Sequence, residues 1–426
     1  MSKLDLVIFG ATGFTGKHAV EHLARGMKEF ADGSVTWGVA GRSKSKLEQI
    51  LQEVSKKTDA NLTNVKIIIA DCGDYNSLKE MCAQARVVVN CCGPYWLYGE
   101  PVVKAAIESG AHHVDVSGEP HFIERMQIEY DKKARDAGVY VVSACGFDSV
   151  PNDMGVVFLE KNFEGTVNSV ESYMSSELPP EYSKDVRERG VINYGTWESA
   201  VCGLSRWNEL GALRKKLYPE RMPTFKPKLQ HRSFIHKYKN GWCIPFMGAD
   251  NSIVYRTQRT LYEREKKRPI QFRAYVHLTS LLYVFLLVLM GSVLFLMTKT
   301  KFTRQLLLNH PRIFSLGFVS KQGPKDVVRK NTRFNVELVG RGWAPGADVE
   351  STTPDRTLVA KVSGLDPGYG FTTTALLMCA HTILTEKHLL PESGGVLTTG
   401  TAFAKTNLIK KLQENNTTFE IMDMKH

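Results

Sequence analysis

Three glycines at intervals of three residues stand near the start of the chain, directly after an apolar stretch. They are Gly10, Gly13 and Gly16, and the stretch before them is LDLVIF at 4–9. Glycine allows the backbone to turn sharply and to approach a ligand closely, and the N-terminus of a following helix directs free N–H groups at an anion. The spacing also occurs by chance in surface loops, but between a strand pattern and a helix pattern it is typical of a loop that binds the pyrophosphate of a dinucleotide. The expected contacts are Gly10, Thr12, Gly13, Phe14, Thr15 and Gly16.

A second group of candidate cofactor contacts follows the next strand pattern, at 35–40. The segment Gly41-Arg42-Ser43-Lys44 stands where an acidic residue binds the ribose of NAD in many dinucleotide folds. This chain has no acidic residue there, whereas Arg42 and Ser43 can donate hydrogen bonds to a 2′-phosphate. A solvated surface charge is the alternative interpretation of Arg42. The segment favours NADP over NAD.

Polar and aromatic residues also follow the later strand patterns. Ligands of a parallel sheet bind beyond the carboxyl ends of its strands, so these residues are expected near the cofactor. Further cofactor contacts are expected from Asp71, Cys92, Gly93 and Pro94. The candidates for a proton donor or a substrate-positioning group are Tyr95, Tyr98, Glu119 and Asp148. Turns and helix caps use the same residue types, so the catalytic residue itself stays unassigned.

The elements that must position these residues follow from hydrophobic periodicity. Strand patterns at 4–9, 35–40, 65–70, 87–91, 112–116 and 139–143 alternate with helical patterns. This alternation predicts an α/β fold with a doubly wound parallel sheet of the Rossmann type, which forms a dinucleotide-binding domain at 1–150. Strand patterns at 167–176, 334–339 and 357–362 and helical patterns at 196–210 and 369–384 predict a second, mixed α+β domain at 151–426, which supplies the substrate side or a homodimer surface.

The longest apolar run of the chain lies inside this second domain. The stretch from Leu278 to Met297 carries no charge, and as a helix it would span about 30 Å, enough to cross a bilayer core. A buried helix is the alternative. Basic residues stand on both sides of the run, which favours the cytosolic side for both ends. The sequence therefore predicts a membrane-associated segment at about 274–319, as a re-entrant or hairpin anchor on the cytosolic face of a membrane or on the phospholipid layer of a lipid droplet.

Composition narrows the classes of partner. The net charge is +11, and much of the excess flanks the apolar run, without the interleaved aromatic residues of a nucleic-acid platform. We therefore favour an anionic membrane surface over nucleic acid. The eight cysteines show neither a CxxC pair nor a Cys/His cluster, so reduced thiols and no metal site are expected, and packing is favoured over redox chemistry for the adjacent Cys91 and Cys92. No signal-peptide pattern precedes the glycine loop.

Eight motifs along the chain resemble those of a known family, the saccharopine dehydrogenase-like oxidoreductases. In order they are VIFGATGFTGK, VAGRSKSKL, NCCGPYWLYGEPVV, DVSGEPHF, GFDSVPNDMG, GTWESA, IPFMGAD and FAKTN. The resemblance covers nearly the whole chain. It implies a nucleotide-binding domain, a second mixed domain, an oxidoreductase activity and, for animal members, association with lipid droplets or other membranes. It does not identify a substrate.

These observations lead to two functional hypotheses. The first is an NADP-preferring oxidoreductase that transfers a hydride to an unknown small-molecule or lipid-derived substrate at a lipid droplet or membrane surface. The alternative is a catalytically inactive nucleotide-binding scaffold or sensor on lipid droplets. Calorimetric titration with the four nicotinamide nucleotides tests the cofactor that both hypotheses share.

Overall fold

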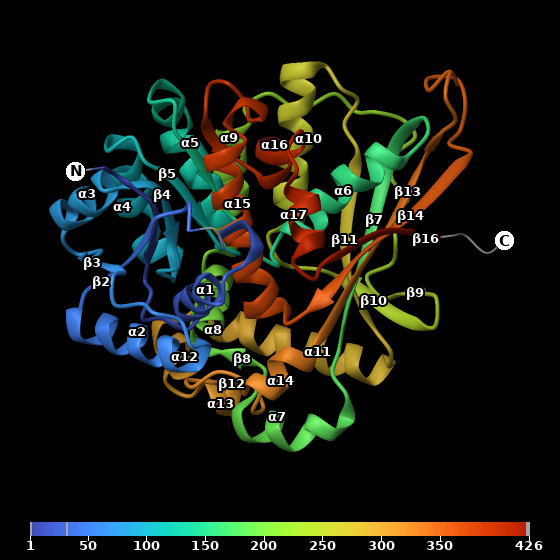
Figure 1. Ribbon diagram of the computed structural model, residues 1–426. Coiled ribbons are helices and arrows are strands. Elements are labelled where there is room, and N and C mark those ends of the chain that lie inside the picture. The colour runs from blue at the N-terminus through green and yellow to red at the C-terminus, as the bar shows by residue number, and fades with distance from the viewer. Residues whose placement is uncertain (1, 31–32, 423–426) are drawn as a thin grey trace.

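The structure is a computed structural model that describes residues 2–30 and 33–422 (Figure 1). In this part of the chain the strands form two sheets of seven strands each and one short two-stranded pair. The first sheet lies in the half of the molecule that holds the N-terminus, and the second lies in the half where the described chain ends (Figure 1). This architecture confirms the predicted combination of a parallel-sheet fold with a second mixed sheet.

The first sheet is entirely parallel, with the strand order β15-β6-β5-β4-β1-β2-β3. The six strands predicted from periodicity are present, with ends that shift by at most two residues. The strands are β1 (Leu4–Phe9), β2 (Trp37–Gly41), β3 (Lys66–Ile69), β4 (Ala85–Asn90), β5 (His112–Asp115), β6 (Tyr140–Val142) and β15 (Gly395–Leu397).

Both faces of this sheet are covered by helices, which explains the continuous apolar run in β1. Leu6 and Ile8 of β1 pack with buried residues of α1 and α2 on one face, whereas Val7 and Phe9 pack with α3 and α4 on the other. A strand that is buried on both faces needs apolar residues at successive positions. The covering helices are α1 (Phe14–Ala24), α2 (Lys44–Thr58), α3 (Tyr75–Ala83), α4 (Tyr95–Glu108) and α5 (Pro120–Asp136).

The second sheet is mixed, with the order β16-β14-β13-β7-β11-β10-β9. Only the pairing of β11 with β7 is parallel among its described strands, and the others are antiparallel. The strands are β7 (Thr166–Glu177), β9 (His236–Tyr238), β10 (Gly241–Pro245), β11 (Gln271–Leu278), β13 (Arg333–Trp343), β14 (Arg356–Leu365) and β16 (Thr418–Met422), and the short pair consists of β8 (Ile192–Asn193) and β12 (Val319–Ser320).

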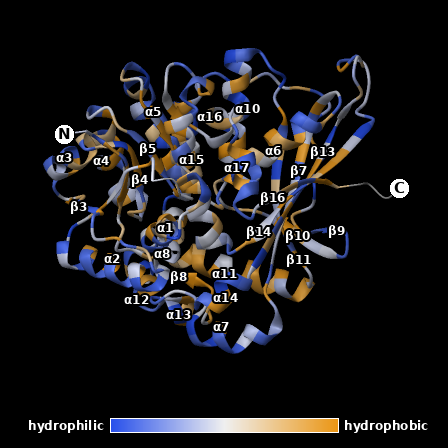
Figure 2. Ribbon diagram, in the orientation of Figure 1, coloured by the Kyte–Doolittle hydropathy of each residue, from blue (hydrophilic) through white to orange (hydrophobic). Residues whose placement is uncertain are grey.

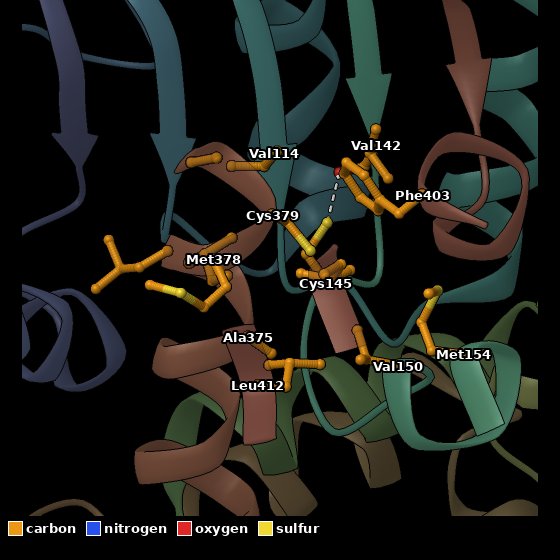
Figure 3. Packing of buried hydrophobic residues seen from close by; sticks show 14 of the residues in the cluster. Val114, Val142, Cys145, Val150, Met154, Ala375, Met378, Cys379, Phe403 and Leu412 are labelled. Atoms are coloured by element: carbon orange, nitrogen blue, oxygen red, sulfur yellow. Dashed lines mark hydrogen bonds between the residues drawn. The ribbon is translucent and has the colours of Figure 1, made fainter. Parts of the chain in front are cut away.

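Helices of the C-terminal part join the two sheets through a shared core. α6 (Val150–Asn162) packs on β13 and β14, and α15 (Thr372–Thr385) packs on β4 and β5 of the first sheet. Figure 3 shows Val114 and Val142 of that sheet close to Cys379 of α15, with Val150 of α6 in the same cluster. Two further short helices, α16 (Thr399–Phe403) and α17 (Leu408–Glu414), also contribute to this core.

The glycine-rich segment at 394–395 belongs to the first sheet. Gly395 starts β15, which pairs in parallel with β6 of that sheet. Gly394 has φ +65° and Gly395 has φ +120°, and a Cβ at Gly394 would lie 2.5 Å from the carbonyl oxygen of Val139. The glycines therefore allow the chain to approach the first sheet closely. The first sheet is thus completed by residues far outside 1–150.

The apolar run also differs from its prediction. Residues 271–278 form β11 between β7 and β10, so the helix α11 begins only at Leu281 and ends at Met297. Across the described residues, no helix is both long and apolar enough to cross a membrane. Figure 2 shows α11 as hydrophobic along its length, yet within it only Val284 is buried among the described residues. A continuous helix from Leu278 to Met297 is therefore not formed, and the re-entrant or hairpin anchor predicted at about 274–319 is not supported by such a helix.

The remaining helices complete the architecture. α12 and α13 follow α11 and are separated at His310-Pro311. Their bounds and those of the other helices are α7 (Ser183–Arg189), α8 (Tyr194–Ser205), α9 (Leu210–Leu217), α10 (Asp250–Glu265), α12 (Lys301–Asn309), α13 (Pro311–Phe314) and α14 (Asp326–Asn331).

Candidate functional site

The glycine loop between β1 and α1 has a shape that only glycine permits at two of its positions. Gly10 has φ +79°, and a Cβ on it would lie 3.1 Å from the backbone nitrogen of Cys92. A Cβ on Gly16 would lie 2.2 Å from the carbonyl oxygen of Gly10. The first helical turn therefore sits directly on the loop, and the loop after β4 reaches it from the other side. This is the close backbone approach that a pyrophosphate-binding loop requires.

The N-terminus of α1 offers free donors at this loop. Among the described residues no side chain caps the helix at Gly13, and no acidic residue stands in its first turn. The N–H groups of that turn are left for an external acceptor, and the helix dipole favours an anion there. The ring of Phe14 contacts the rings of His18 and Tyr369, with centroids 4.8 and 4.6 Å apart. The side chain of Phe14 thus fixes the helix start against the C-terminal part, and its backbone N–H remains for a cofactor.

The turn after β2 places a free cation at the same edge of the sheet. Arg42 is exposed and has no ion-pair partner among the residues that the structure describes. The neighbouring Ser43 caps α2, because its hydroxyl oxygen accepts a hydrogen bond from the backbone nitrogen of Lys46 over 3.4 Å. A 2′-phosphate beside Arg42 would also meet the N-terminus of α2. The loop, the helix start and this arginine fit an NADP molecule.

The loops after β3 and β4 complete the cofactor edge. The carboxylate of Asp71 accepts a hydrogen bond from the backbone nitrogen of Gly73 over 2.9 Å, which shapes the turn after β3. The backbone nitrogen of Cys92 donates to the side-chain oxygen of Asn90 over 3.0 Å. Gly93 is exposed, and Pro94 precedes the first residue of α4. The structure therefore brings these predicted contacts to one edge, although their role toward a cofactor stays a prediction.

Two of the four candidate proton donors are engaged inside the protein. The carboxylate of Glu119 accepts the backbone N–H groups of Tyr95 and Trp96 over 3.0 and 2.9 Å, and Glu119 is 3% exposed. It therefore holds the first turn of α4. The hydroxyl of Tyr95 donates to the carbonyl oxygen of Asn90 over 2.9 Å and is buried, which raises the pKa of Tyr95 well above its usual range. These contacts give both residues a positioning task.

Asp148 and Tyr98 remain as candidates that can meet a substrate. Tyr98 is 42% exposed on α4. Asp148 is half-buried in the loop after β6, and a Cβ on Gly118 would lie 2.9 Å from its carboxylate oxygen. The loops after β5 and β6 therefore meet at Asp148. Burial raises the pKa of Asp148 to about 6, so this carboxyl can hold a proton close to neutral pH.

A second buried carboxyl lies beside Asp148 and was not identified from the sequence. Asp250, the first residue of α10, is 1% exposed and accepts a hydrogen bond from the side-chain nitrogen of Asn152 over 2.5 Å. Burial, followed by the charge of Asp148, raises the pKa of Asp250 to about 8. The motif IPFMGAD contains this residue, but nothing in its spacing indicates a contact with residue 148. Two interacting carboxyls of this kind cannot both ionise easily and share protons near neutral pH.

A large cavity is lined by the two residues that follow Asp250 in α10. It has a volume of about 980 Å³, and Asn251 and Ser252 of α10 line it together with the irregular segment at 218–233. Its walls combine aromatic and aliphatic side chains with several arginines. Lining residues that illustrate this mixture are Phe225, Tyr255, Phe272, Arg221, Arg256 and Arg273.

Comparison with known proteins agrees with this geometry. Residues 6–142 match the family model of the saccharopine dehydrogenase NADP binding domain. The human saccharopine dehydrogenase-like oxidoreductase is 39% identical over 98% of this chain and 97% of its own length. A Caenorhabditis elegans protein named lipid droplet localized protein is 39% identical over 99% of each chain.

A solved structure supports the fold over the full length. The yeast saccharopine dehydrogenase (L-Glu forming) superposes with a TM-score of 0.53 and covers 99% of this chain and 100% of its own, at 15% sequence identity. At this identity the likeness concerns the fold alone. The family model for NADP binding and the free arginine after β2 agree on NADP as the cofactor.

Proposed function

The chain belongs to the saccharopine dehydrogenase-like oxidoreductases, and from this membership we propose that it reduces a substrate with NADPH, with Asp148 as the proton donor. The observation that carries this assignment is the half-buried carboxyl of Asp148, which lies at the carboxyl edge of the NADP-binding sheet and beside the buried Asp250. When bound, NADPH supplies a hydride to an electrophilic carbon.

Residues of the chain account for the binding of the cofactor and for the proton that the substrate receives. Gly10, Gly13 and Gly16 cradle the pyrophosphate against α1, and Arg42 binds the 2′-phosphate. Asp148 donates its proton to the substrate atom that gains negative charge. Burial raises the pKa of Asp148 to about 6, so part of this carboxyl holds a proton near neutral pH. Asp250 is a positioning residue, because burial and the charge of Asp148 raise its pKa to about 8 and keep it protonated beside Asp148.

The cavity beside Asp250 is proposed as the substrate pocket. Its arginines favour a substrate with an anionic group, and its apolar walls favour one with an aliphatic part. Arg214 and Arg232 in its wall are paired with Glu124 and Glu171 over 2.9 and 2.8 Å. Arg221 and Arg273 have no such partner among the described residues and are therefore available to an anion.

NADPH oxidation with defined probes tests the activity. The probes are a long-chain aldehyde, a long-chain 2-enoyl thioester and a cyclic imine carboxylate, followed by absorbance at 340 nm and by transfer of deuterium from labelled NADPH. We expect at least one probe to be reduced, with a kcat at least 100-fold lower in Asp148→Asn, as expected for loss of a general acid. Tight NADPH binding without oxidation by any probe would instead support the scaffold alternative.

We also propose that the protein binds a phospholipid surface through an apolar surface formed by α11, α12 and α13. Residues Leu282, Leu289, Val293 and Leu296 of α11 are 45% to 68% exposed and recur every three to seven positions, so they share one side of the helix. Phe302, Ile313 and Leu316 continue the exposed apolar residues beyond α11, at 68% to 76% exposure. An exposed apolar surface of this kind marks an interaction site.

Basic residues at the border of the apolar surface support an anionic phospholipid layer as its partner. Lys299, Lys301 and Arg304 follow α11 directly, and cations beside an apolar helix favour anionic head groups. The name of the C. elegans relative, a lipid droplet localized protein, agrees with this assignment. The predicted hairpin is thereby replaced by a helix that lies on the lipid layer.

Flotation with vesicles of phosphatidylcholine and phosphatidylserine tests the lipid contact. The double variant Leu289→Asp with Leu296→Asp should stay with the soluble fraction, whereas the wild type should float. Leu365→Asp is the matched control, because Leu365 is 48% exposed at the end of β14 and lies outside the apolar surface. Equal flotation of the double variant and the wild type would contradict this assignment.

A further inference from the structure

Two cysteines that are twenty positions apart in the sequence touch at the NADP-binding edge. The sulfur atoms of Cys72 and Cys92 are 3.7 Å apart. Cys72 follows β3 and Cys92 follows β4, and β1 and β2 lie between these strands in the sheet. The two loops must therefore extend toward each other over the carboxyl ends of β1 and β2, where the adenosine end of a dinucleotide binds.

The surroundings of this pair differ from those of the other thiols. Cys72, Cys91 and Cys92 are all partly buried, but Cys72 and Cys92 pack on one face of the first sheet and Cys91 packs on the opposite face. A hydrogen bond from Cys72 lowers the pKa of Cys92, and the positive charge of Arg42 acts in the same direction. Burial raises the pKa of Cys91 to about 12. Cys92 is therefore the thiol of this edge that forms a thiolate most readily.

We propose that Cys72 and Cys92 form a reversible oxidation site that links the loops after β3 and β4 by a disulfide and thereby closes the adenosine end of the NADP site. The contact between the two sulfur atoms carries this inference. A disulfide requires the sulfur atoms to approach to about 2.05 Å, a small movement for two loop side chains that already touch.

The chemistry needs a peroxide as the oxidant. The Cys92 thiolate attacks one peroxide oxygen, the O–O bond breaks, and the departing oxygen leaves as water after protonation. The sulfur of Cys72 then attacks the resulting sulfenic acid, an S–S bond forms, and the hydroxyl of the sulfenic acid leaves as a second water. Two thiols are oxidised by two electrons and one peroxide is reduced to two waters. A dithiol protein reverses the step by thiol–disulfide exchange.

The disulfide has a consequence for NADPH. A covalent link between the two loops fixes them in contact where the adenosine must pass, so the oxidised protein binds NADPH more weakly. Bound NADPH separates or covers the thiols and slows their oxidation. This consequence rests on the proposed place of the 2′-phosphate at Arg42, whereas the disulfide itself does not.

Peptide mapping after treatment with hydrogen peroxide tests the disulfide. Trypsin cleavage after Lys66 and Lys79 releases a peptide in which Cys72 is the one cysteine, and cleavage after Arg86 and Lys104 releases Cys91 together with Cys92. We expect these two peptides to be linked. The variant Cys91→Ala, which keeps Cys72 and Cys92, should give the same link, and Cys72→Ser should not.

The affinity for NADPH is measured on the same samples by calorimetry. We expect oxidation to weaken binding at least tenfold in the wild type and in Cys91→Ala, with recovery after reduction, and no change in Cys72→Ser. Saturating NADPH should slow formation of the linked peptide. A link between Cys91 and Cys92, or no link, would overturn the inference. A Cys72–Cys92 link that leaves the affinity for NADPH unchanged would overturn the proposed effect of the disulfide on cofactor binding. That result would not change the outcome expected in the NADPH oxidation test.

Discussion

The most direct perturbation of the cofactor loop is the change of Gly16 to alanine. The added Cβ would lie 2.2 Å from the carbonyl oxygen of Gly10 and 2.8 Å from the Cα of Ala11. Both contacts are to backbone atoms, so no side chain can rotate away. To restore a normal contact, the start of α1 must move from the loop by about 1 Å, at a cost of about 1–3 kcal/mol in the free energy of unfolding.

The same movement weakens cofactor binding. The N–H groups of the first turn of α1 would shift by about 1 Å relative to the pyrophosphate, which is enough to break a hydrogen bond. Loss of one hydrogen bond to a charged group costs about 1.5–3 kcal/mol, or about a tenfold to hundredfold increase in the Kd for NADPH.

Calorimetric titration with NADPH measures this loss, and circular dichroism verifies that the variant is folded. Gly211→Ala in α9 is the matched control, because a Cβ there meets nothing within 4 Å. Alanine is the better helix former, so this control should bind NADPH normally and be slightly more stable. A folded Gly16→Ala variant whose Kd lies within twofold of the wild type would refute the assigned role of this loop.

Two further changes test the carboxyls around the site. Glu119→Gln should lower the free energy of unfolding in urea by about 1–3 kcal/mol, because an amide cannot accept both backbone N–H groups of α4. Glu48→Gln, at an exposed residue, is the control. The control should change the free energy of unfolding by less than about 0.5 kcal/mol. Asp148→Asn should remove a pH dependence. The pKa of Asp148 is raised from 3.8 to about 6, so the folded wild type holds a proton that the unfolded chain releases, and its stability should fall as the pH rises through this window. Urea titrations at pH 4.5 and pH 7 measure this fall in the free energy of unfolding, and the fall should be smaller in the variant. An equal fall in both proteins would contradict the environment described for Asp148.

Local sequence patterns predicted the elements of the first sheet well. The apolar run in β1 and the glycines after it depend on neighbours within a few residues, so their spacing alone indicates a buried strand, a tight turn and a helix start. The same holds for the strand patterns up to 142. The division into domains at 150 stays a prediction. The first sheet itself extends beyond that boundary, because β15 joins it from residues 395–397.

Contacts between distant segments could not be predicted in this way. Residues 271–278 lead directly into the apolar helix, and their strand conformation depends on pairing with β7 and β10. Likewise, the task of Glu119 depends on where α4 begins, and the effect of Asp148 on the pKa of Asp250 depends on the packing of α10 against α6. Tertiary contacts of this kind leave no periodic signal in a single sequence.

The affinity of Arg42 variants for NADPH and NADH tests the central claim most directly. We expect the wild type to bind NADPH at least tenfold more tightly than NADH. Arg42→Met should lose most of this preference, because the contact with the 2′-phosphate is removed. Its affinity for NADH should stay within about twofold of the wild type. Lys44→Met, at an exposed residue two positions later, should retain most of the preference. Equal binding of both nucleotides by the wild type, or an unchanged preference in Arg42→Met, would contradict the assigned NADP site.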